Sequence, residues 1–155
     1  MAVIYETENF IVKTYTTPEV PHNDRLDGGH IIISPKIEVE SRQDLTPAQL
    51  VEFIWLSSIV GEAMTKVLTE KGIEIGRINY QDNGNYNHKF HLHLYGRAKS
   101  ATKQPYGKPF VIYTEDFENW KDNKPLTQED IAKIKSKIEE LSTLKKYQKQ
   151  LFKFN

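Results

Sequence analysis

The sequence predicts an α+β fold, in which an antiparallel sheet of about five strands carries one packed helix and an added C-terminal helix. Three observations lead to this prediction. A helix start signal stands at Thr46, a strand-turn-strand pattern runs over residues 73–97, and a second helix signal stands at Thr127. With 155 residues, the chain is long enough to form one domain with a real core.

The charge and composition of the chain limit the kinds of partner and chemistry that we expect. Lys plus Arg equals Asp plus Glu at 21 each, so no overall field attracts nucleic acid or a membrane surface, and we expect neither as a partner. The sequence has no cysteine, which excludes disulfides, thiolate zinc sites and a cysteine nucleophile. We see no secretory signal and no apolar run approaching the roughly 20 residues of a membrane span, so we expect a cytoplasmic protein.

Two strands are expected in the first part of the chain. Residues 9–15 read as a strand, and the loop that follows contains Pro18, Pro21 and a Gly-Gly pair. Residues 30–36 form a β-branched run that Pro35 stops, which predicts a buried strand with a histidine at its entrance. We expect the loop histidine His22 to be a loop or surface residue.

The first helix begins at a clear signal. Thr46 is an N-cap residue, Pro47 occupies the first helical position, and Gln49 completes a capping box. Apolar residues then follow helical spacing until Gly72, where we expect the helix to end. This apolar stripe is best explained as the side that packs on the core.

The second part of the chain predicts three further strands and a helix. Residues 73–81 and 88–97 flank a turn and form a hairpin, and residues 110–113 are a candidate edge strand. Thr127 is an N-cap candidate followed by acidic residues, which the helix dipole favours. The helix after it has a narrow apolar stripe that would pack on the domain or on a second subunit, formed by Ile131, Ile134, Ile138, Leu141 and Leu144.

The strongest chemical signal lies in residues 88–97. On a regular strand Lys89, His91 and His93 share one face, and the apolar residues between them share the other. Two imidazoles beside a fixed cation suit an anionic substrate such as a phosphate, because they can attack, donate protons and neutralise charge. We expect His88 to be a loop or surface residue.

Several polar residues around the hairpin are candidates for binding the substrate. An antiparallel hairpin places Arg77, Asn79 and Gln81 on one face, near the histidine face if the register allows it. Fixed donors are needed to meet the charge of phosphoryl oxygens. The candidate substrate-binding residues are Lys89, Asn79, Gln81, Asn83, Asn87 and Arg97.

In its motifs, the chain resembles the histidine-triad (HIT) superfamily of nucleotide hydrolases and transferases. Residues 30–36 match its upstream strand of the form His-apolar-apolar-apolar-x-Pro-Lys, and the Thr46 helix matches the next element. His91-Leu92-His93 matches the last two histidines of the triad, and residues 81–84 look like the turn before it. Ordered elements that agree at the right spacing are more specific than any one of them.

The resemblance implies roles for four residues. The middle histidine of the family is the nucleophile, which corresponds to His91. The last histidine supports phosphate charge and proton transfer, which corresponds to His93, and the upstream histidine near the catalytic centre corresponds to His30. The position of the first triad histidine, which helps to orient and polarise the centre, holds Lys89.

The resemblance also implies an organisation and a partner. We expect a HIT-like domain over residues 1–120, with residues 121–155 as a C-terminal helical extension of the same domain. The family implies a homodimer with a nucleotide as its small-molecule substrate. The chemistry demands neither a cofactor nor a metal.

Three functions remain open on the sequence. The first is a hydrolase or nucleotidyl transferase that acts on the α-phosphate of nucleoside phosphates, of the dinucleoside polyphosphate or phosphoramidate type, through a nucleotidyl-histidine. The second is a non-catalytic HIT domain that binds nucleotides, which the lysine at position 89 favours. The third is a metal site formed by His30, His91 and His93, because paired strand histidines also bind zinc, copper or iron.

Overall fold

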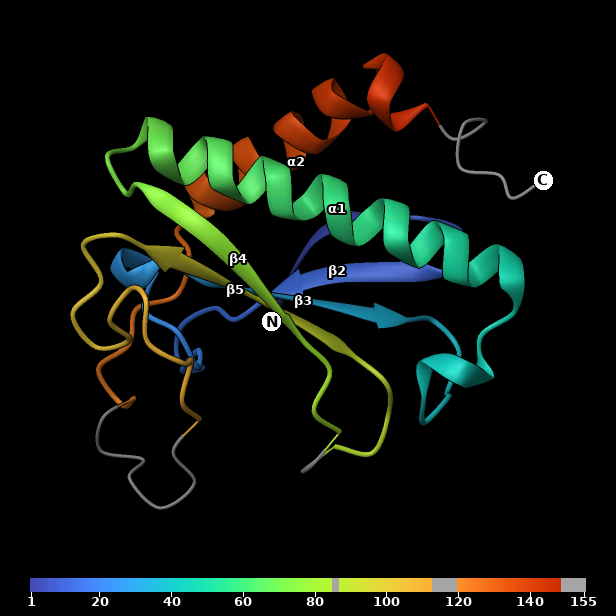
Figure 1. Ribbon diagram of the computed structural model, residues 1–155, viewed down its shortest axis with the longest axis horizontal. Coiled ribbons are helices and arrows are strands. Elements are labelled where there is room, and N and C mark those ends of the chain that lie inside the picture. The colour runs from blue at the N-terminus through green and yellow to red at the C-terminus, as the bar shows by residue number, and fades with distance from the viewer. Residues whose placement is uncertain (85–86, 113–119, 149–155) are drawn as a thin grey trace.

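The structure is a computed structural model that describes residues 1–84, 87–112 and 120–148. Its centre is a five-stranded antiparallel sheet, and both α-helices lie on one side of this sheet (Figure 1). The structure therefore confirms the predicted α+β fold. The strands, in the order in which they lie in the sheet, are β1 (Ala2–Glu6), β2 (Phe10–Thr14), β3 (His30–Pro35), β5 (Leu92–Ala98) and β4 (Ile75–Gln81).

One predicted strand is wrong and one strand was missed. Residues 110–112 form no strand, and Tyr113 lies outside the described residues. The reason is local, because the side-chain amide of Gln104 bonds both the N–H and the carbonyl of Val111, at 3.2 and 2.8 Å, in place of a neighbouring strand. The fifth strand is instead β1, which pairs with β2 and buries Ile4 in the core.

The first helix forms as predicted. Helix α1 (Pro47–Glu70) starts with the expected capping box, in which Thr46 and Gln49 bond each other's backbone N–H groups. It ends just before Gly72, whose φ of +84° lies in the region that favours glycine. Its buried residues join the inward residues of the sheet in one core, as the stripe predicted.

The sheet register places polar side chains together on the other face. In β5, Tyr95 lies opposite His30 of β3 and Asn79 of β4, and His93 lies opposite Gln81 of β4. Neighbouring residues such as Leu94 point to the opposite face and belong to the core with α1. The expected pairing of the Asn79 and Gln81 face with the histidine face is thus present.

The second helix packs on the same chain. Helix α2 (Gln128–Ser142) has a capping box between Thr127 and Asp130, and it contacts α1 and β1. Four residues of its predicted stripe are buried, whereas Leu144, just beyond the helix, is 47% exposed. No helix in the described part of the chain combines the length and the hydropathy needed to cross a membrane.

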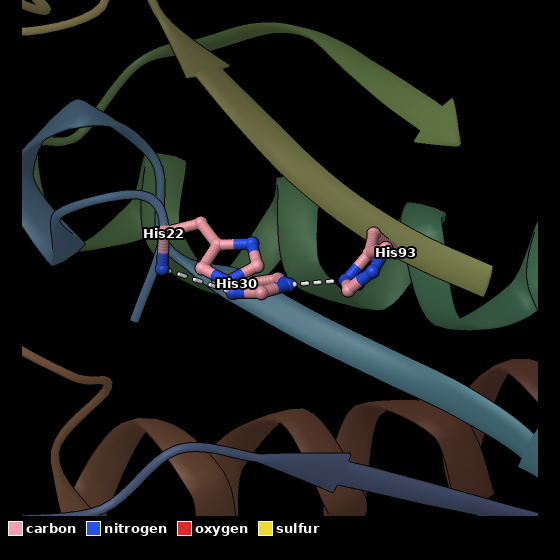
Figure 2. Close-up of side chains that lie close together, drawn as sticks. All are labelled: His22, His30 and His93. Carbon is pink, nitrogen blue, oxygen red and sulfur yellow. Dashed lines mark hydrogen bonds between the residues drawn. The ribbon is translucent and has the colours of Figure 1, made fainter. Parts of the chain in front are cut away.

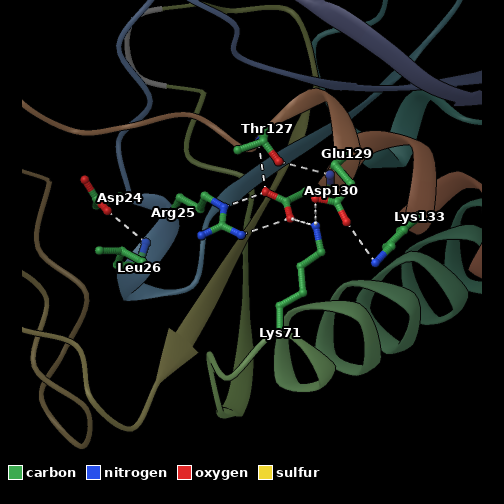
Figure 3. A network of polar contacts seen from close by, with 8 residues as sticks. All are labelled: Asp24, Arg25, Leu26, Lys71, Thr127, Glu129, Asp130 and Lys133. Carbon is green, nitrogen blue, oxygen red and sulfur yellow. Dashed lines mark hydrogen bonds and ion pairs between the residues drawn. The ribbon is translucent and has the colours of Figure 1, made fainter.

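A buried carboxylate fastens the start of α2 to the rest of the domain (Figure 3). Asp130 is fully buried and accepts hydrogen bonds from Arg25 Nε at 2.6 Å and from Lys71 Nζ at 2.7 Å. The backbone N–H of Thr127 donates to the same carboxylate at 2.8 Å. Burial alone would raise the pKa of Asp130, but these donors outweigh it together and hold the pKa below its ordinary value.

We predict that Asp130→Asn lowers the free energy of unfolding by about 3 kcal/mol at pH 7, because two cations lose their shared partner. The folded-state pKa of Asp130 is lowered, so its contribution is present above the unfolded pKa of about 4 and is lost as the pH falls. Urea denaturation from pH 7 to pH 3 measures both effects. The difference between parent and variant should shrink towards acid pH.

The matched control is Glu129→Gln, which removes the neighbouring acidic residue of the same helix. The Glu129 side chain is 66% exposed where it pairs with Lys71 and Lys133, so its loss should change stability little. Equal effects of the two substitutions would show that the burial of Asp130 does not matter.

Candidate active site at the start of β5

His91 immediately precedes β5 and has a defined ring orientation. Its Nδ1 lies 2.6 Å from the backbone carbonyl oxygen of Lys89. A carbonyl oxygen only accepts hydrogen bonds, so Nδ1 carries the proton and the lone pair of the neutral ring is on Nε2. The ring also lies edge-on to His93, with 4.6 Å between centroids. His91 therefore presents an unprotonated nitrogen that can act as a nucleophile.

Three further histidine residues, His22, His30 and His93, are linked in a chain (Figure 2), and the ring of His91 lies against that of His93. The backbone N–H of His22 donates to Nδ1 of His30 at 3.3 Å. Nε2 of His30 lies 2.9 Å from Nδ1 of His93. His30 stands at the start of β3 and His93 near the start of β5, so this chain connects two neighbouring strands inside the sheet.

The direction of this chain fixes the protons. A backbone N–H can only donate, so Nδ1 of His30 has no proton and its Nε2 carries one. Nε2 of His30 then donates to Nδ1 of His93, which leaves the proton of a neutral His93 on its Nε2. His93 can therefore donate a hydrogen bond from Nε2, whereas His91 can attack through its own Nε2.

Burial keeps these rings neutral. His30 is 1% exposed and His93 is 6% exposed. Desolvation holds the pKa of His30 well below its usual range and lowers the pKa of His93 to about 3. The same effect lowers the pKa of the half-buried His22. At neutral pH the rings of His22, His30 and His93 are therefore neutral.

His22 was missed by the sequence reasoning, which placed it on a loop or at the surface. It does lie on a loop, but its ring stacks on His30 with 5.0 Å between centroids, and its Nδ1 lies 3.0 Å from the hydroxyl oxygen of Tyr95. The Tyr95 ring in turn stacks on the rings of His93 and Phe110. The one sequence signal that this loop brings His22 onto His30 was its Pro-rich composition, with Gly-Gly just before His30.

The loop carrying His22 docks directly on β5. Asn23 Nδ2 donates to the carbonyl oxygens of Gly29 and Gly96, at 3.1 and 2.8 Å. A Cβ at Gly96 would overlap the carbonyl oxygen of Gly28, so only glycine allows this close approach. The position of the His22 backbone relative to β3 and β5 is fixed by these contacts.

Lys89 does not lie on the histidine face of a regular strand, so that prediction is wrong. Strand β5 begins at Leu92, and the alternation of faces therefore does not extend back to residue 89. The ammonium group of Lys89 pairs with Glu38, and its side chain is 61% exposed. Asn87 Oδ1 accepts a hydrogen bond from the backbone N–H of Lys89 at 3.1 Å, which orders the backbone before His91.

Arg97 is brought to the same face, but its guanidinium is used inside the protein. Its Nη2 donates to the carbonyl oxygens of Gln104, Pro105 and Lys108 at 2.9 to 3.3 Å. The residue is only 4% exposed. Asn79 lies beside it, with its Oδ1 3.5 Å from Nη1. Arg97 therefore holds the loop after β5, and this geometry does not direct it at a phosphate.

A polar pocket of about 210 Å³ lies beside His91, between the loop before α1 and the turn after β4. Arg42, Asp82, Asn83 and Phe90 contribute to its lining. Arg42 Nε donates to Asp82 at 2.9 Å across this pocket. Of the predicted substrate-binding residues, Asn83 is thus placed next to His91, whereas Gln81 lies opposite His93 in the sheet.

The histidine cluster also bears on the alternative of a metal site. Nitrogen atoms of His22, His30 and His93 lie within 4.8 Å of one another, so the close group contains His22 in place of the predicted His91. A metal ligand must offer a free lone pair. The only lone pair of His30 accepts from the His22 backbone and its N–H bonds His93, so metal binding would break this chain.

Comparisons with solved structures show which fold this chain shares with known proteins. The fold is that of solved histidine-triad proteins, among them one from Sinorhizobium meliloti with a TM-score of 0.61 and 16% identity, covering 89% of this chain and 87% of that chain. One from Marinobacter aquaeolei has a TM-score of 0.61 and 19% identity, covering 90% and 87%. A hypothetical histidine triad nucleotide-binding protein from Sulfolobus tokodaii has a TM-score of 0.57 and 17% identity, covering 90% and 85%.

The family itself follows from the sequence. The HIT domain pattern matches residues 2–100, which is most of the chain. This chain therefore belongs to the HIT domain family, as its motifs indicated. No curated protein matches it in sequence.

We predict that the buried histidines make stability depend on pH between 6.5 and 5. Their folded-state pKa values are lowered, so the unfolded chain binds protons first and stability falls as the pH falls below 6.5. Each histidine that stays neutral in the folded protein should lower the free energy of unfolding by up to about 1.4 kcal/mol for each pH unit below 6.5. Urea denaturation at several pH values measures this slope.

His30→Asn should reduce the dependence of stability on pH by the contribution of one histidine. This should hold whatever the effect of the substitution on stability at pH 7. His88→Ala, at an exposed position three residues before His91, should leave the slope unchanged. A slope that His30→Asn does not reduce would show that His30 is not held neutral in the folded protein.

Proposed function

We propose that this protein is a hydrolase or nucleotidyl transferase that acts on the α-phosphate of nucleoside phosphates, of the dinucleoside polyphosphate or phosphoramidate type. Membership of the HIT family gives the class of substrate. The observation that carries the proposal is the hydrogen bond from His91 Nδ1 to the Lys89 carbonyl, which leaves Nε2 of His91 as a nucleophile.

In the first step, Nε2 of His91 attacks the α-phosphorus. A phosphorus–nitrogen bond forms, and the bond between phosphorus and the leaving group breaks. The electron pair of the broken bond goes to the leaving group, whose negative charge accepts a hydrogen bond from the Nε2–H of His93, and His30 orients His93 through their hydrogen bond. The product of this step is a nucleotidyl-histidine.

In the second step, water attacks the same phosphorus and the bond to His91 breaks. The electron pair of the broken bond returns to Nε2 of His91, and the water proton is released to solvent, which restores the starting state. Another acceptor in place of water would make the reaction a transfer. The polar pocket next to His91, which Asn83 and Asp82 help to line, is where we place the group that leaves.

The first test of this proposal is a covalent adduct. We predict that incubation with a panel of adenylated and guanylated substrates adds one nucleotidyl mass to the parent protein, seen by intact mass spectrometry. His91→Ala should give no adduct and lose turnover by about 10,000-fold or more, because no other group replaces the nucleophile.

His88→Ala is the matched control, since it removes an exposed histidine of the same segment. It should retain both the adduct and the turnover. An adduct of equal yield in the parent and in His91→Ala would end the assignment of His91 as nucleophile.

The non-catalytic nucleotide-binding domain remains a second candidate, and Lys89 is the observation that favours it. Its ammonium group pairs with the exposed Glu38, so it offers no obvious substitute for the first triad histidine. Nucleotide affinity without turnover, unchanged in Lys89→His, would support this alternative.

We predict that Lys89→Ala changes turnover by less than about threefold, because an exposed ion pair contributes little to function or stability. Steady-state kinetics of the purified variant measure this. Lys99→Ala, which removes another exposed lysine paired with a glutamate, is the control. A loss of more than about 100-fold would show that Lys89 supplies acid–base assistance in the role of the first triad histidine.

We also retain the homodimer that the family resemblance implies as part of the proposal. Strands β1 and β4 are the outer strands of the described sheet, and each offers an edge for pairing. The division at residue 120 and the cytoplasmic location stay predictions.

A further inference from the structure

The part of the chain that matches the HIT domain ends at residue 100, but residues 120–126 lie against the candidate active site. This segment comes just before α2. Asn123 Nδ2 donates to the carbonyl oxygen of Pro21 at 3.0 Å, and Pro21 is the residue before His22. The contact joins two positions that are 102 residues apart in the sequence.

Further contacts bind the same two segments. The backbone N–H of Arg25 donates to the Lys124 carbonyl at 2.9 Å. The backbone N–H of Lys124 donates to the Asp24 carboxylate at 2.8 Å. The Trp120 ring lies 5.3 Å from the ring of His22, measured between centroids. The His22 loop is therefore held by the extension from one side and by β5 from the other.

Asn123 is itself buried and oriented. It is 6% exposed, and its Oδ1 accepts a hydrogen bond from Lys103 Nζ at 2.9 Å. Its backbone N–H donates to the Trp120 carbonyl at 2.7 Å. Because Lys103 takes the oxygen, Nδ2 is the end of the amide that faces Pro21, and only an amide side chain satisfies both partners.

The position of this loop matters for the protons of the site. The His22 N–H meets Nδ1 of His30 at 3.3 Å, which is long for a hydrogen bond between nitrogen atoms and therefore sensitive to a small shift of the backbone. If this donor moves away, Nδ1 of His30 is free to take a proton. His30 Nε2 would then accept from His93 Nδ1, and His93 would lose the Nε2–H that donates a hydrogen bond to the leaving group.

We propose that Asn123 is a positioning residue that holds the His22 backbone and thereby sets the tautomers of His30 and His93. The consequence for catalysis rests on the proposed function, whereas the consequence for the tautomers does not. The extension beyond the HIT domain then helps to set the tautomers of the site, although none of the residues that the structure describes in it touches the reacting atoms.

The test uses the full-length chain with Asn123→Asp, which keeps the size and the contact with Lys103 but loses the donor to Pro21. Long-range ¹H–¹⁵N spectra of the histidine rings in the free protein report the tautomers. In the parent, Nδ1 of His30 and Nδ1 of His93 should both be unprotonated. In the variant, both rings should show a mixture of tautomers.

Kinetics give the second readout. Asn123→Asp should lower kcat by about 10-fold, with KM changed by less than about twofold, because the hydrogen bond from His93 to the leaving group is impaired and binding is not. The acid limb of the profile of kcat against pH should move to higher pH, because Nδ1 of His30 takes a proton more easily once the His22 N–H no longer donates to it. Asn123→Ala should behave in the same way.

Tyr147→Phe is the control within the same extension. The Tyr147 hydroxyl donates to Glu62 of α1 at 2.6 Å, so its loss weakens the attachment of the extension without reaching the His22 loop. It should leave the tautomers and the pH profile unchanged.

Several results would overturn the proposal. One is a parent spectrum in which His30 carries its proton on Nδ1, and this measurement needs neither a variant nor activity. Another is a folded Asn123 variant with parent-like tautomers. If the protein turns over no nucleotide but the tautomers shift in Asn123→Asp, the positioning role stands and the proposed function fails.

Discussion

The hydrogen bond between His30 and His93 is the interaction on which the candidate site depends. It joins the neighbouring strands β3 and β5 on the face of the sheet opposite α1, and it is buried. A buried pair of imidazoles is stable only as a neutral donor and acceptor, so the protons must be placed by donors that cannot themselves change. The His22 backbone N–H is such a donor at one end. The same logic applies to His91, whose tautomer is set by the Lys89 carbonyl. The backbone thus decides which ring nitrogen carries the proton in His30 and in His91.

Much of the fold could be predicted because its signals are local. The caps at Thr46 and Thr127 involve residues three positions apart, and both helices start where these signals stand. Strand β1 was missed, because a short apolar segment becomes a strand only through its partner β2. The edge strand predicted at residues 110–113 was wrong for the opposite reason. Its sequence suits a strand, but Gln104 satisfies the backbone of Val111 through a side chain, which no periodicity reveals.

The site was predictable to the extent that it follows strand pairing. His30, His91 and His93 were found from motif spacing, and the register of β3 with β5 brings two of them into contact. His22 could not be found this way, because its place depends on a loop held by contacts distant in sequence. The prediction that Lys89 shares a strand face with His91 and His93 was wrong for a different reason. The alternation rule applies only within a strand, and β5 begins after residue 91.

The charges of the site argue for hydrogen-bond donors in place of fixed cations. Two cations were expected to meet the phosphate, but Arg97 bonds three backbone carbonyls and Lys89 pairs with Glu38. The histidines that burial keeps neutral add no positive charge before the reaction. Charge that develops on a phosphoryl group would then be met by N–H donors whose direction is set in advance, which is effective in a site that excludes water. Such a site depends on the placement of protons more than a cationic site does. This is why we propose that a contact as distant as that of Asn123 with Pro21 bears on the chemistry at His91.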